Sequence, residues 1–323
     1  MTCTRRLLVG SAISGLAAPA LAQPDFPNRP IRFLLGFPPG GASDAALRII
    51  QPRVQQALGQ PMVIDNRPGA AGNLSAEAVA RSAPDGHTLV SANIGTMSVN
   101  PALFRNLPFD PVADFAPITL LHNVVNVLVV PADRPWRNLA EFLTAARARP
   151  DAVTCGSSGV GSLGHLAMIR FEQQGGIRVT HVPYRGGGPL MTGLISGETD
   201  FAFATMGTVL PQLEANKLRA FAVATATRAQ HLPDLPTLIE QGFPDFDAQN
   251  WDGILAPRAT PQPILDRLGS VLRTILTDPT IQQEFLRRGF EARPCTAEEF
   301  ARQIASDAAR WQPIVRAAGV SAG

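Results

Sequence analysis

Short apolar runs alternate with longer amphipathic stretches from residue 31 onward. The alternation begins with strand-like runs and helical stretches at residues 31–35, 44–58, 61–64, 73–81 and 87–90. Short apolar runs between turn residues are typical of buried strands, whereas apolar positions three and four apart are typical of helices that cover a sheet. Strands that alternate with helices predict an α/β unit built on a parallel sheet.

A second unit follows residue 124. It alternates strand-like runs and helices at residues 124–130, 139–149, 153–154, 163–172, 178–182, 190–196 and 201–203. The apolar run 218–226 leads back towards 251–255, and helices are expected at 263–277, 281–288 and 297–318. We therefore expect an α/β fold of two lobes, each a mainly parallel sheet flanked by helices, with lobe I at 23–124 plus 227–323 and lobe II at 125–226. Ligands favour the cleft between such lobes.

The first 22 residues have the pattern of an export signal. Arg5 and Arg6 precede an apolar segment of mostly small residues at 7–19, and an Ala-Leu-Ala cleavage motif ends at Ala22. This pattern predicts a signal peptide at 1–22 and a periplasmic mature protein. The arginine pair also fits the twin-arginine route, so the general and the twin-arginine export routes both stay open.

The charge balance argues against nucleic-acid binding. The chain has 28 Lys+Arg and 26 Asp+Glu, and loss of the two leader arginines leaves 26 of each. A neutral chain whose only lysine is Lys217 lacks the basic surface of a nucleic-acid binder. Only Cys155 and Cys295 follow the leader, and whether they form a disulfide stays open.

Residues 155–165 read CGSSGVGSLGH and contain a formal G-x-G-x-x-G between a strand and a helix. A dinucleotide site also needs an acidic residue about 20 positions further on, at the end of the next strand. That strand, IRVTHVPYR (177–185), has none, although Arg185 would suit a 2′-phosphate. An exported protein also meets little nicotinamide cofactor, so we expect no cofactor.

The same turn suits a carboxylate. Backbone N–H groups and the dipole at a helix start attract anions, and serine hydroxyls add donors. A second glycine turn, FPPGGASD (37–44), joins a strand to a helix in the other lobe, and a third turn lies at 92–96. Two such turns facing each other would suit a ligand with two carboxylates. The alternative is that the glycines only permit tight turns and that Ser162 only caps a helix.

In this order the turns resemble those of the periplasmic solute receptors of tripartite tricarboxylate transporters, the Bug receptors. The matching segments are FPPGGASD (37–44), DNRPGAAGN (65–73), SAPDGHTL (82–89), NPALF (100–104), CGSSGVGSLGHL (155–166), HVPYRGGGP (181–189), GETDFAF (197–203) and WDGILAP (251–257). The resemblance implies a two-lobed, type II periplasmic-binding-protein fold that closes on a small carboxylate. The ligand would then pass to separate membrane permease subunits, and we expect the receptor to be a monomer.

The resemblance also implies the residues that contact the ligand. The turn at Gly40 and Gly41 would hold one carboxylate through backbone amides, and the turn in lobe II would hold the other. Asp200 matches an acidic position that faces the ligand amine in amino-acid-binding members and elsewhere holds water or braces a loop. The candidate ligand-binding residues are Phe37, Pro39, Gly40, Gly41, Asp44, Asn93, Thr96, Ser157, Ser158, Gly161, Ser162, His165 and Asp200. Cys155 replaces a frequent aromatic residue at the cleft border, which leaves ligand size open.

Two other functions fit parts of the sequence. Ser157, His165 and Asp200 are the residue types of a hydrolase triad, but the spacing of Gly156 and Gly159 does not match the G-x-S-x-G nucleophile elbow. We therefore expect no catalytic residue and no enzyme activity. The five histidines show no metal-ligand spacing, so we expect no metal site. A receptor of the same fold that reports its ligand to a sensor protein stays open.

Overall fold

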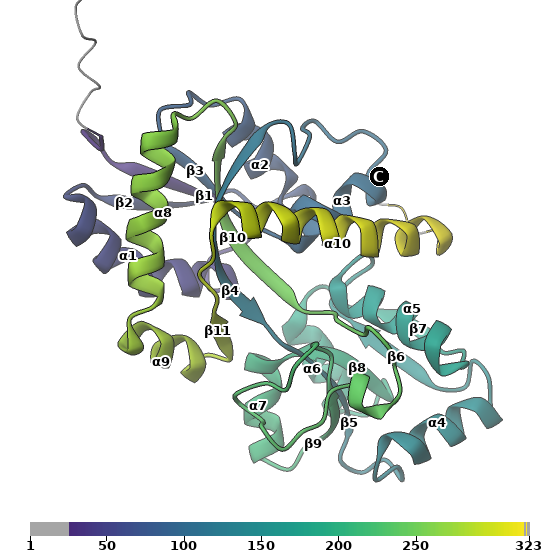
Figure 1. The fold of residues 1–323 in the computed structure, drawn as a ribbon. Coiled ribbons are helices and arrows are strands. Elements are labelled where there is room, and N and C mark those ends of the chain that lie inside the picture. Colours follow the sequence, from purple (N-terminus) through teal and green to yellow (C-terminus); the bar gives the residue numbers. More distant parts are fainter. Residues whose placement is uncertain (1–25, 320, 322–323) are drawn as a thin grey trace, which may run out of the picture.

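The computed structural model of this chain describes residues 26–319 and 321 and has two lobes, each with its own sheet (Figure 1). The predicted signal peptide at 1–22 lies outside the described residues. Helices flank both sheets, and two segments cross between the lobes (Figure 1). The structure confirms the predicted two-lobed α/β architecture.

Lobe I is built on a six-stranded sheet in the order β11-β4-β10-β3-β1-β2. Its strands are β1 (Ile31–Leu35), β2 (Met62–Asn66), β3 (Thr88–Asn93), β4 (Phe115–Val124), β10 (Asn250–Pro257) and β11 (Phe290–Ala292). β1 pairs in parallel with β2 and β3, β10 lies antiparallel between β3 and β4, and β11 is antiparallel to β4. Four strands thus share one direction, and β10 and β11 oppose them.

The helices of lobe I lie on the two faces of this sheet because side chains alternate along its strands. On β1, Ile31, Phe33 and Leu35 pack with one set of helices, whereas Leu34 packs on the opposite face. The first face carries α1 (Ala42–Leu58), α8 (Gln262–Leu276) and α9 (Pro279–Arg287). The second face carries η1 (Ala70–Gly72), α2 (Asn73–Ala80), η2 (Gly95–Val99), α3 (Asn100–Leu103) and α10 (Ala297–Ala317).

Lobe II is built on a five-stranded sheet in the order β7-β6-β8-β5-β9. Its strands are β5 (Asn126–Pro131), β6 (Thr154–Ser157), β7 (Thr180–Pro183), β8 (Phe201–Thr205) and β9 (Leu218–Val223), and its helices are α4 (Leu139–Ala148), α5 (Leu163–Gly175), α6 (Gly187–Ile195) and α7 (Met206–Glu214). β6 pairs in parallel with β7 and β8, whereas β5 is antiparallel to β8 and β9. The strand that enters from lobe I is therefore the one that opposes the others.

The two crossings lie side by side and are hydrogen-bonded to each other. One runs from β4 through Val125 into β5, and the Asn126 side chain donates to Ala248 O in the other (2.9 Å). Residues 227–249, which were expected in lobe I, pack on lobe II instead, because Phe243 stacks on Phe171 at a centroid distance of 4.9 Å. The second crossing between the lobes thus lies near Ala248, about 20 residues after the predicted boundary at 227. Residues 227–249 also include the short helix η3 (Ile239–Gln241).

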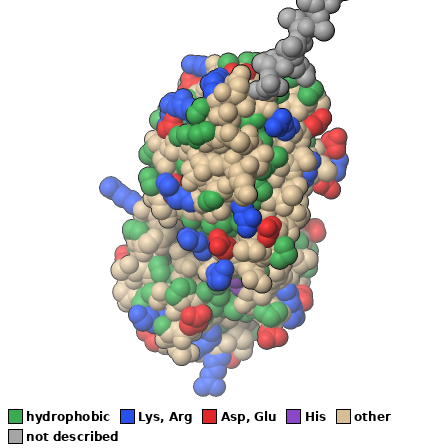
Figure 2. All heavy atoms as spheres, turned by 90° about the vertical axis from the view of Figure 1, so that its left-hand side faces the viewer, with side chains coloured by type: hydrophobic (Ala, Val, Ile, Leu, Met, Phe, Trp, Pro, Cys, Tyr) green, Lys and Arg blue, Asp and Glu red, His purple; other side chains and the backbone are tan. Residues whose placement is uncertain are grey.

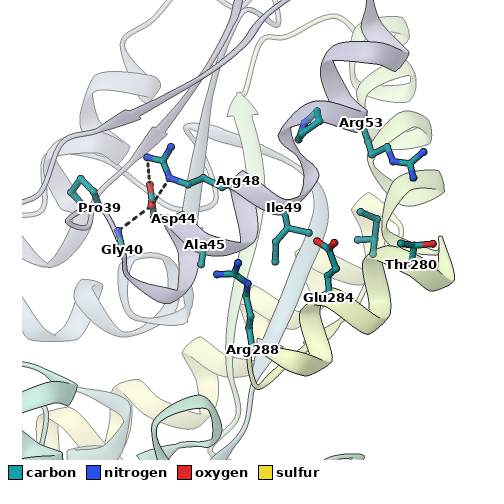
Figure 3. A pocket seen from close by; sticks show the side chains of 12 residues that line it. Pro39, Gly40, Asp44, Ala45, Arg48, Ile49, Arg53, Thr280, Glu284 and Arg288 are labelled. Atoms are coloured by element: carbon teal, nitrogen blue, oxygen red, sulfur yellow. Dashed lines mark hydrogen bonds and ion pairs between the residues drawn. The ribbon is translucent and has the colours of Figure 1, made fainter.

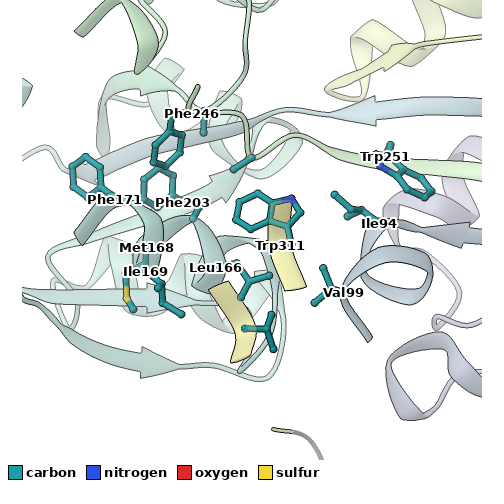
Figure 4. Packing of buried hydrophobic residues seen from close by; sticks show 14 of the residues in the cluster. Ile94, Val99, Leu166, Met168, Ile169, Phe171, Phe203, Phe246, Trp251 and Trp311 are labelled. Carbon is teal, nitrogen blue, oxygen red and sulfur yellow. The ribbon is translucent and has the colours of Figure 1, made fainter. Parts of the chain in front are cut away.

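The C-terminal helix α10 connects the two lobes. It packs on η2, α3 and β4 of lobe I and on α5 of lobe II. Trp311 of α10 is fully buried between Phe203 and Phe246 on one side and Ile94 and Val99 on the other (Figure 4). A continuous apolar core therefore runs from one lobe into the other through this helix.

Candidate functional site

Most of the predicted site residues lie on turns that follow parallel strands. In lobe I these turns join β1 to α1 and β3 to η2, and in lobe II the turn joins β6 to α5. The β2–η1 and β7–α6 turns lie at the same ends of the two sheets. Open α/β sheets bind ligands at the carboxyl ends of their strands, where such turns gather and helix N-termini point outward. The topology thus brings the glycine-rich turns of each lobe to one edge of its sheet.

The β1–α1 turn is organised by Asp44. Its carboxylate accepts hydrogen bonds from the Gly40 N–H (3.0 Å), from the Arg48 guanidinium (2.7 Å) and from the Asn66 side chain (3.2 Å). Burial alone would raise the pKa of Asp44, but these donors, Arg48 first, hold it below its ordinary value. Asp44 is therefore an internal acceptor of the turn. The Gly40 amide is already used, while the helix-start amides that follow have no intrahelical partner.

Beneath this turn lies a buried polar group that the sequence analysis did not identify. Ser43, in the first turn of α1, donates to the Asp252 carboxylate of β10 (2.7 Å). The other oxygen of Asp252 lies 3.1 Å from His122 Nε2, and both side chains are almost fully buried. These three residues tie the start of α1 to β4 and β10, the two strands that lead to the crossings.

The remaining lobe I residues converge on the loop between β2 and α2. Thr96 Oγ1 lies 3.1 Å from Ala71 O, and the Asn93 side chain accepts from the Thr96 N–H (3.0 Å). The Phe37 ring would lie 3.5 Å from a Cβ placed on Gly72. Phe37, Asn93 and Thr96 are therefore brought together around residues 71–72.

This β2–α2 loop was matched by its sequence but not assigned a role. Ala70 and Ala71 have positive φ angles of +46° and +54°, which alanine adopts only at a cost. Asn100 helps to hold the strained backbone by donating to Ala71 O (3.2 Å) and to the Asn73 side chain (2.6 Å). Such strain is concentrated at ligand-binding sites, and the signal for it in the sequence was the Pro-Gly-Ala-Ala-Gly run.

In lobe II, the β6–α5 turn is held by a serine and a histidine. Ser157 is fully buried, its Oγ lies 2.7 Å from His181 Nε2, and it also accepts from the Gly159 N–H (3.2 Å). Ser158 is exposed, and Ser162 caps α5 by accepting from the His165 N–H (3.4 Å). Ser157 thus shapes the turn from within, and Ser158 presents its hydroxyl outside it.

His165 and His181 form a stacked pair under this turn. Their ring centroids are 3.9 Å apart, and the planes differ by 7°. His165 Nδ1 accepts from the Gly161 N–H (3.1 Å), which places the proton of the neutral ring on Nε2. Burial and the neighbouring His181 lower the pKa of His165 to about 4, and burial also lowers the pKa of His181. Both rings are therefore neutral at pH 7.

Asp200 lies away from the other candidates. It precedes β8, and its carboxylate accepts from the Thr154 N–H (2.8 Å) and pairs with Arg134 (3.0 Å). Thr154 begins β6 and Ser157 ends it, and β6 and β8 are parallel, so Asp200 and Ser157 lie at opposite ends of the sheet. Asp200 thus braces the starts of β6 and β8, at the end of the sheet opposite to the glycine-rich turns. The residues of the hydrolase triad are not assembled, because Ser157 meets His181.

The glycine-rich turn of lobe II contacts lobe I through Gly161 and Leu103. A Cβ on Gly161 would lie 2.8 Å from Leu103 Cδ2, so the lobe II turn rests against α3 of lobe I. Leu103 lies one helical turn after Asn100. The Asn100 side chain donates to Ala71 O, the same carbonyl that accepts from the Thr96 hydroxyl. The contact with Leu103 places the lobe II turn beside the part of lobe I that holds Thr96 and residues 71–72.

A cavity of about 640 Å³ opens beside the β1–α1 turn and is lined by Pro39, Gly40 and Asp44 together with residues of α1 and α9 (Figure 3). All of its lining residues belong to lobe I. It therefore borders the candidate site without joining the two turns.

The described residues contain no metal-binding cluster, no membrane-spanning helix and no disulfide. Among residues 26–319 and 321, no group of three His, Cys, Asp or Glu side chains is placed to hold a metal ion. Within those ranges, no helix has the length and apolar character needed to cross a membrane. Cys155 and Cys295 are both free thiols, and burial raises the pKa of each.

A two-lobed α/β fold with glycine-rich turns at the carboxyl ends of its strands is typical of a solute-binding receptor, and comparisons with known proteins agree. The family model described as "Tripartite tricarboxylate transporter family receptor" matches residues 46–320. The protein BugT of Bordetella pertussis is 32% identical over 323 residues, covering 99% of each chain. The chain therefore belongs to the tripartite tricarboxylate transporter receptor family. It is a periplasmic-type solute-binding receptor and not an enzyme, as predicted.

Two similar solved structures contain carboxylates. R. palustris Rpa4515 with adipate has a TM-score of 0.82 and 32% identity, covering 92% of this chain and 99% of that chain. MatC from Rhodopseudomonas palustris with bound malate has a TM-score of 0.76 and 30% identity, covering 90% of this chain and 100% of that chain.

Proposed function

We propose that this receptor captures a small dicarboxylate between its lobes and delivers it to the membrane subunits of a tripartite tricarboxylate transporter. The observation that carries the proposal is the contact between Gly161 of the glycine-rich turn in lobe II and Leu103 of α3 in lobe I, which joins the two lobes beside the predicted site. A ligand that touches both turns stabilises the closed arrangement, since only that arrangement supplies both sets of donors.

The donors available at the two turns suit carboxylates. In lobe I they are the amides at the start of α1 beyond Gly40, with Asn93 and Thr96 beside them. In lobe II they are the exposed Ser158 and the amides at the start of α5. Charge-assisted hydrogen bonds contribute about 1.5–3 kcal/mol each, so a few of them supply the roughly 8 kcal/mol of micromolar binding after ordering costs.

The dicarboxylate class is supported by the two similar structures, one with adipate and one with malate. The predicted leader at 1–22 and the periplasmic class of the family support export. We propose that the mature receptor acts as a monomer, since closure of one chain supplies both turns.

The test is a thermal and calorimetric screen of the mature protein against adipate, malate, tricarboxylates, aromatic acids and acidic amino acids. A ligand present at 100 times its Kd should add about 2.7 kcal/mol to the free energy of unfolding and raise Tm. Adipamide, which keeps the length of adipate without its charges, is the matched control and should not bind. If none of these acids raises Tm or gives a binding heat, the proposed function is wrong.

A further inference from the structure

The cavity beside the β1–α1 turn continues as a groove between α1 and α9. We call it the α1/α9 groove and define it by Arg48, Ile49, Arg53, Thr280, Glu284 and Arg288. It opens on the face that carries α1, α8 and α9, where basic side chains lie interspersed with a few acidic ones around the middle of the surface (Figure 2). Apart from Pro39, Gly40 and Asp44, the residues that line it are not among the candidate ligand-binding residues.

The charge of the groove is not balanced internally. Arg48 is paired with Asp44, which leaves Arg53 and Arg288 against Glu284. Both arginines are exposed, and within residues 26–319 and 321 neither forms an ion pair. The Thr280 N–H and the nearby Arg53 both lower the pKa of the Asp278 carboxyl at the start of α9. Figure 3 shows Arg288 reaching from the end of α9 towards the start of α1. The groove thus presents two guanidinium groups around an apolar floor that includes Ile49.

One end of the groove borders the proposed ligand site. Pro39 and Gly40 belong both to the groove lining and to the turn that begins α1. A molecule seated in the groove therefore contacts the same turn that would hold the ligand.

The other wall of the groove is attached to lobe II. Beyond α9 the chain turns at Gly289, where a Cβ would lie 2.5 Å from Gly207 Cα at the start of α7. Nearby, His231 Nε2 lies 2.9 Å from Leu286 O of α9. A change in the angle between the lobes therefore acts on α9, whereas α1 belongs to lobe I alone.

We propose that the α1/α9 groove is the surface on which the membrane permease docks, through a permease segment that carries carboxylate side chains. This inference rests on the proposed function. Two unpaired guanidinium groups over an apolar floor suit an acidic polypeptide, since Arg binds carboxylates through paired hydrogen bonds. The groove borders the ligand turn at one end and the contact between lobes at the other, so the docked segment senses whether the receptor is loaded and closed.

The experiment compares ligand binding with uptake. The variant Arg53→Glu/Arg288→Glu reverses the groove charge, and Arg267→Glu/Arg302→Glu makes the same change at exposed positions outside it. Kd is measured by calorimetry with the carboxylate found in the screen. Uptake of that radiolabelled acid is measured in the source strain lacking this gene and supplied with each variant.

The groove variant should keep Kd within about twofold and Tm unchanged, yet lose at least about tenfold in uptake, since charges in an interface act on association with the partner. The control variant should keep both. Arg53→Ala/Arg288→Ala should give a smaller loss of uptake. This variant replaces the charge-reversed one in the test if the reversed charges impair folding.

Three outcomes overturn the inference. Normal uptake by the groove variant excludes docking there. If the groove variant loses ligand affinity to the same extent as uptake, the arginines bind a free anion instead. The same holds if calorimetry of the unaltered protein shows a second binding event for citrate that the variant removes. If no acid in the screen binds, the proposed function fails and this inference fails with it.

Discussion

The hydroxyl of Ser157 lies 2.7 Å from His181 Nε2, across the neighbouring strands β6 and β7. This bond fixes the turn that presents Ser158 and the start of α5, while the second ring, His165, lies stacked beneath it. The serine is therefore a positioning residue of a binding turn rather than a nucleophile.

Ser157→Ala should lower the free energy of unfolding by about 1–3 kcal/mol, because it leaves the partly buried His181 ring and Gly159 N–H without their hydrogen-bond partner. Carboxylate affinity should fall as well, since the turn loses its internal support. Urea denaturation and calorimetry measure both effects. Ser158→Ala, at an exposed position, is the stability control and should change unfolding by less than about 0.5 kcal/mol. An equal loss in both variants would contradict the positioning role.

Stability should fall as pH decreases towards 4, partly through His165. The folded protein binds a proton there only near pH 4, whereas the ordinary pKa is 6.5. Between these values the unfolded chain binds more protons, so the linkage destabilises the fold by at most about 3 kcal/mol at pH 4. His165→Gln should flatten the difference in unfolding free energy between pH 7 and pH 4. An unchanged slope in this variant would show that His165 is not responsible.

Gly161→Ala should disturb both stability and binding. Gly161 has a φ of +76°, which alanine adopts at a cost, and its Cβ would press on Leu103. We expect a loss of about 1–3 kcal/mol in unfolding free energy and a weaker Kd, measured by denaturation and calorimetry. Gly187→Ala is the matched control, because a Cβ there meets nothing within 4 Å. Leu103→Ala should restore part of the lost affinity in the double variant; no recovery would argue against the contact.

Trp311→Ala should destabilise the protein by about 3–5 kcal/mol, since it empties a fully buried site between the lobes. Trp311→Phe should cost much less, because Trp311 Nε1 has no hydrogen-bond partner among the described residues. Thermal denaturation of the two variants gives the comparison. Similar losses for Ala and Phe would show that ring volume is not what the site requires.

The alternation of strands and helices was enough to predict the two lobes, but not every element. β4 was missed because Pro117 and the polar residues Thr119, His122 and Asn123 interrupt its apolar run. The structure accommodates Pro117 next to an irregularity in the pairing with β10. Helix α7 was missed because Gly207 and Pro211 lie within it. Breakers inside an element hide it when only local preference is considered.

The lobe boundary shows a similar limit. Residues 227–249 contain few regular elements, so the sequence offered no reason to assign them to lobe II. Phe243 and Phe246 pack on Phe171 and Phe203 of that lobe, and these aromatic contacts are long-range.

The α/β class, the repeated unit and the glycine turns could be predicted from the sequence, because periodicity and turn chemistry are local properties of the chain. The contacts of the site could not: Asp44 accepts from the Gly40 amide, His181 supports Ser157, and Asp200 lies at the far end of its sheet. Each of these depends on which strands become neighbours and in which direction they run. The order and direction of the strands depend on burial of the whole core, so they cannot be predicted from any short segment.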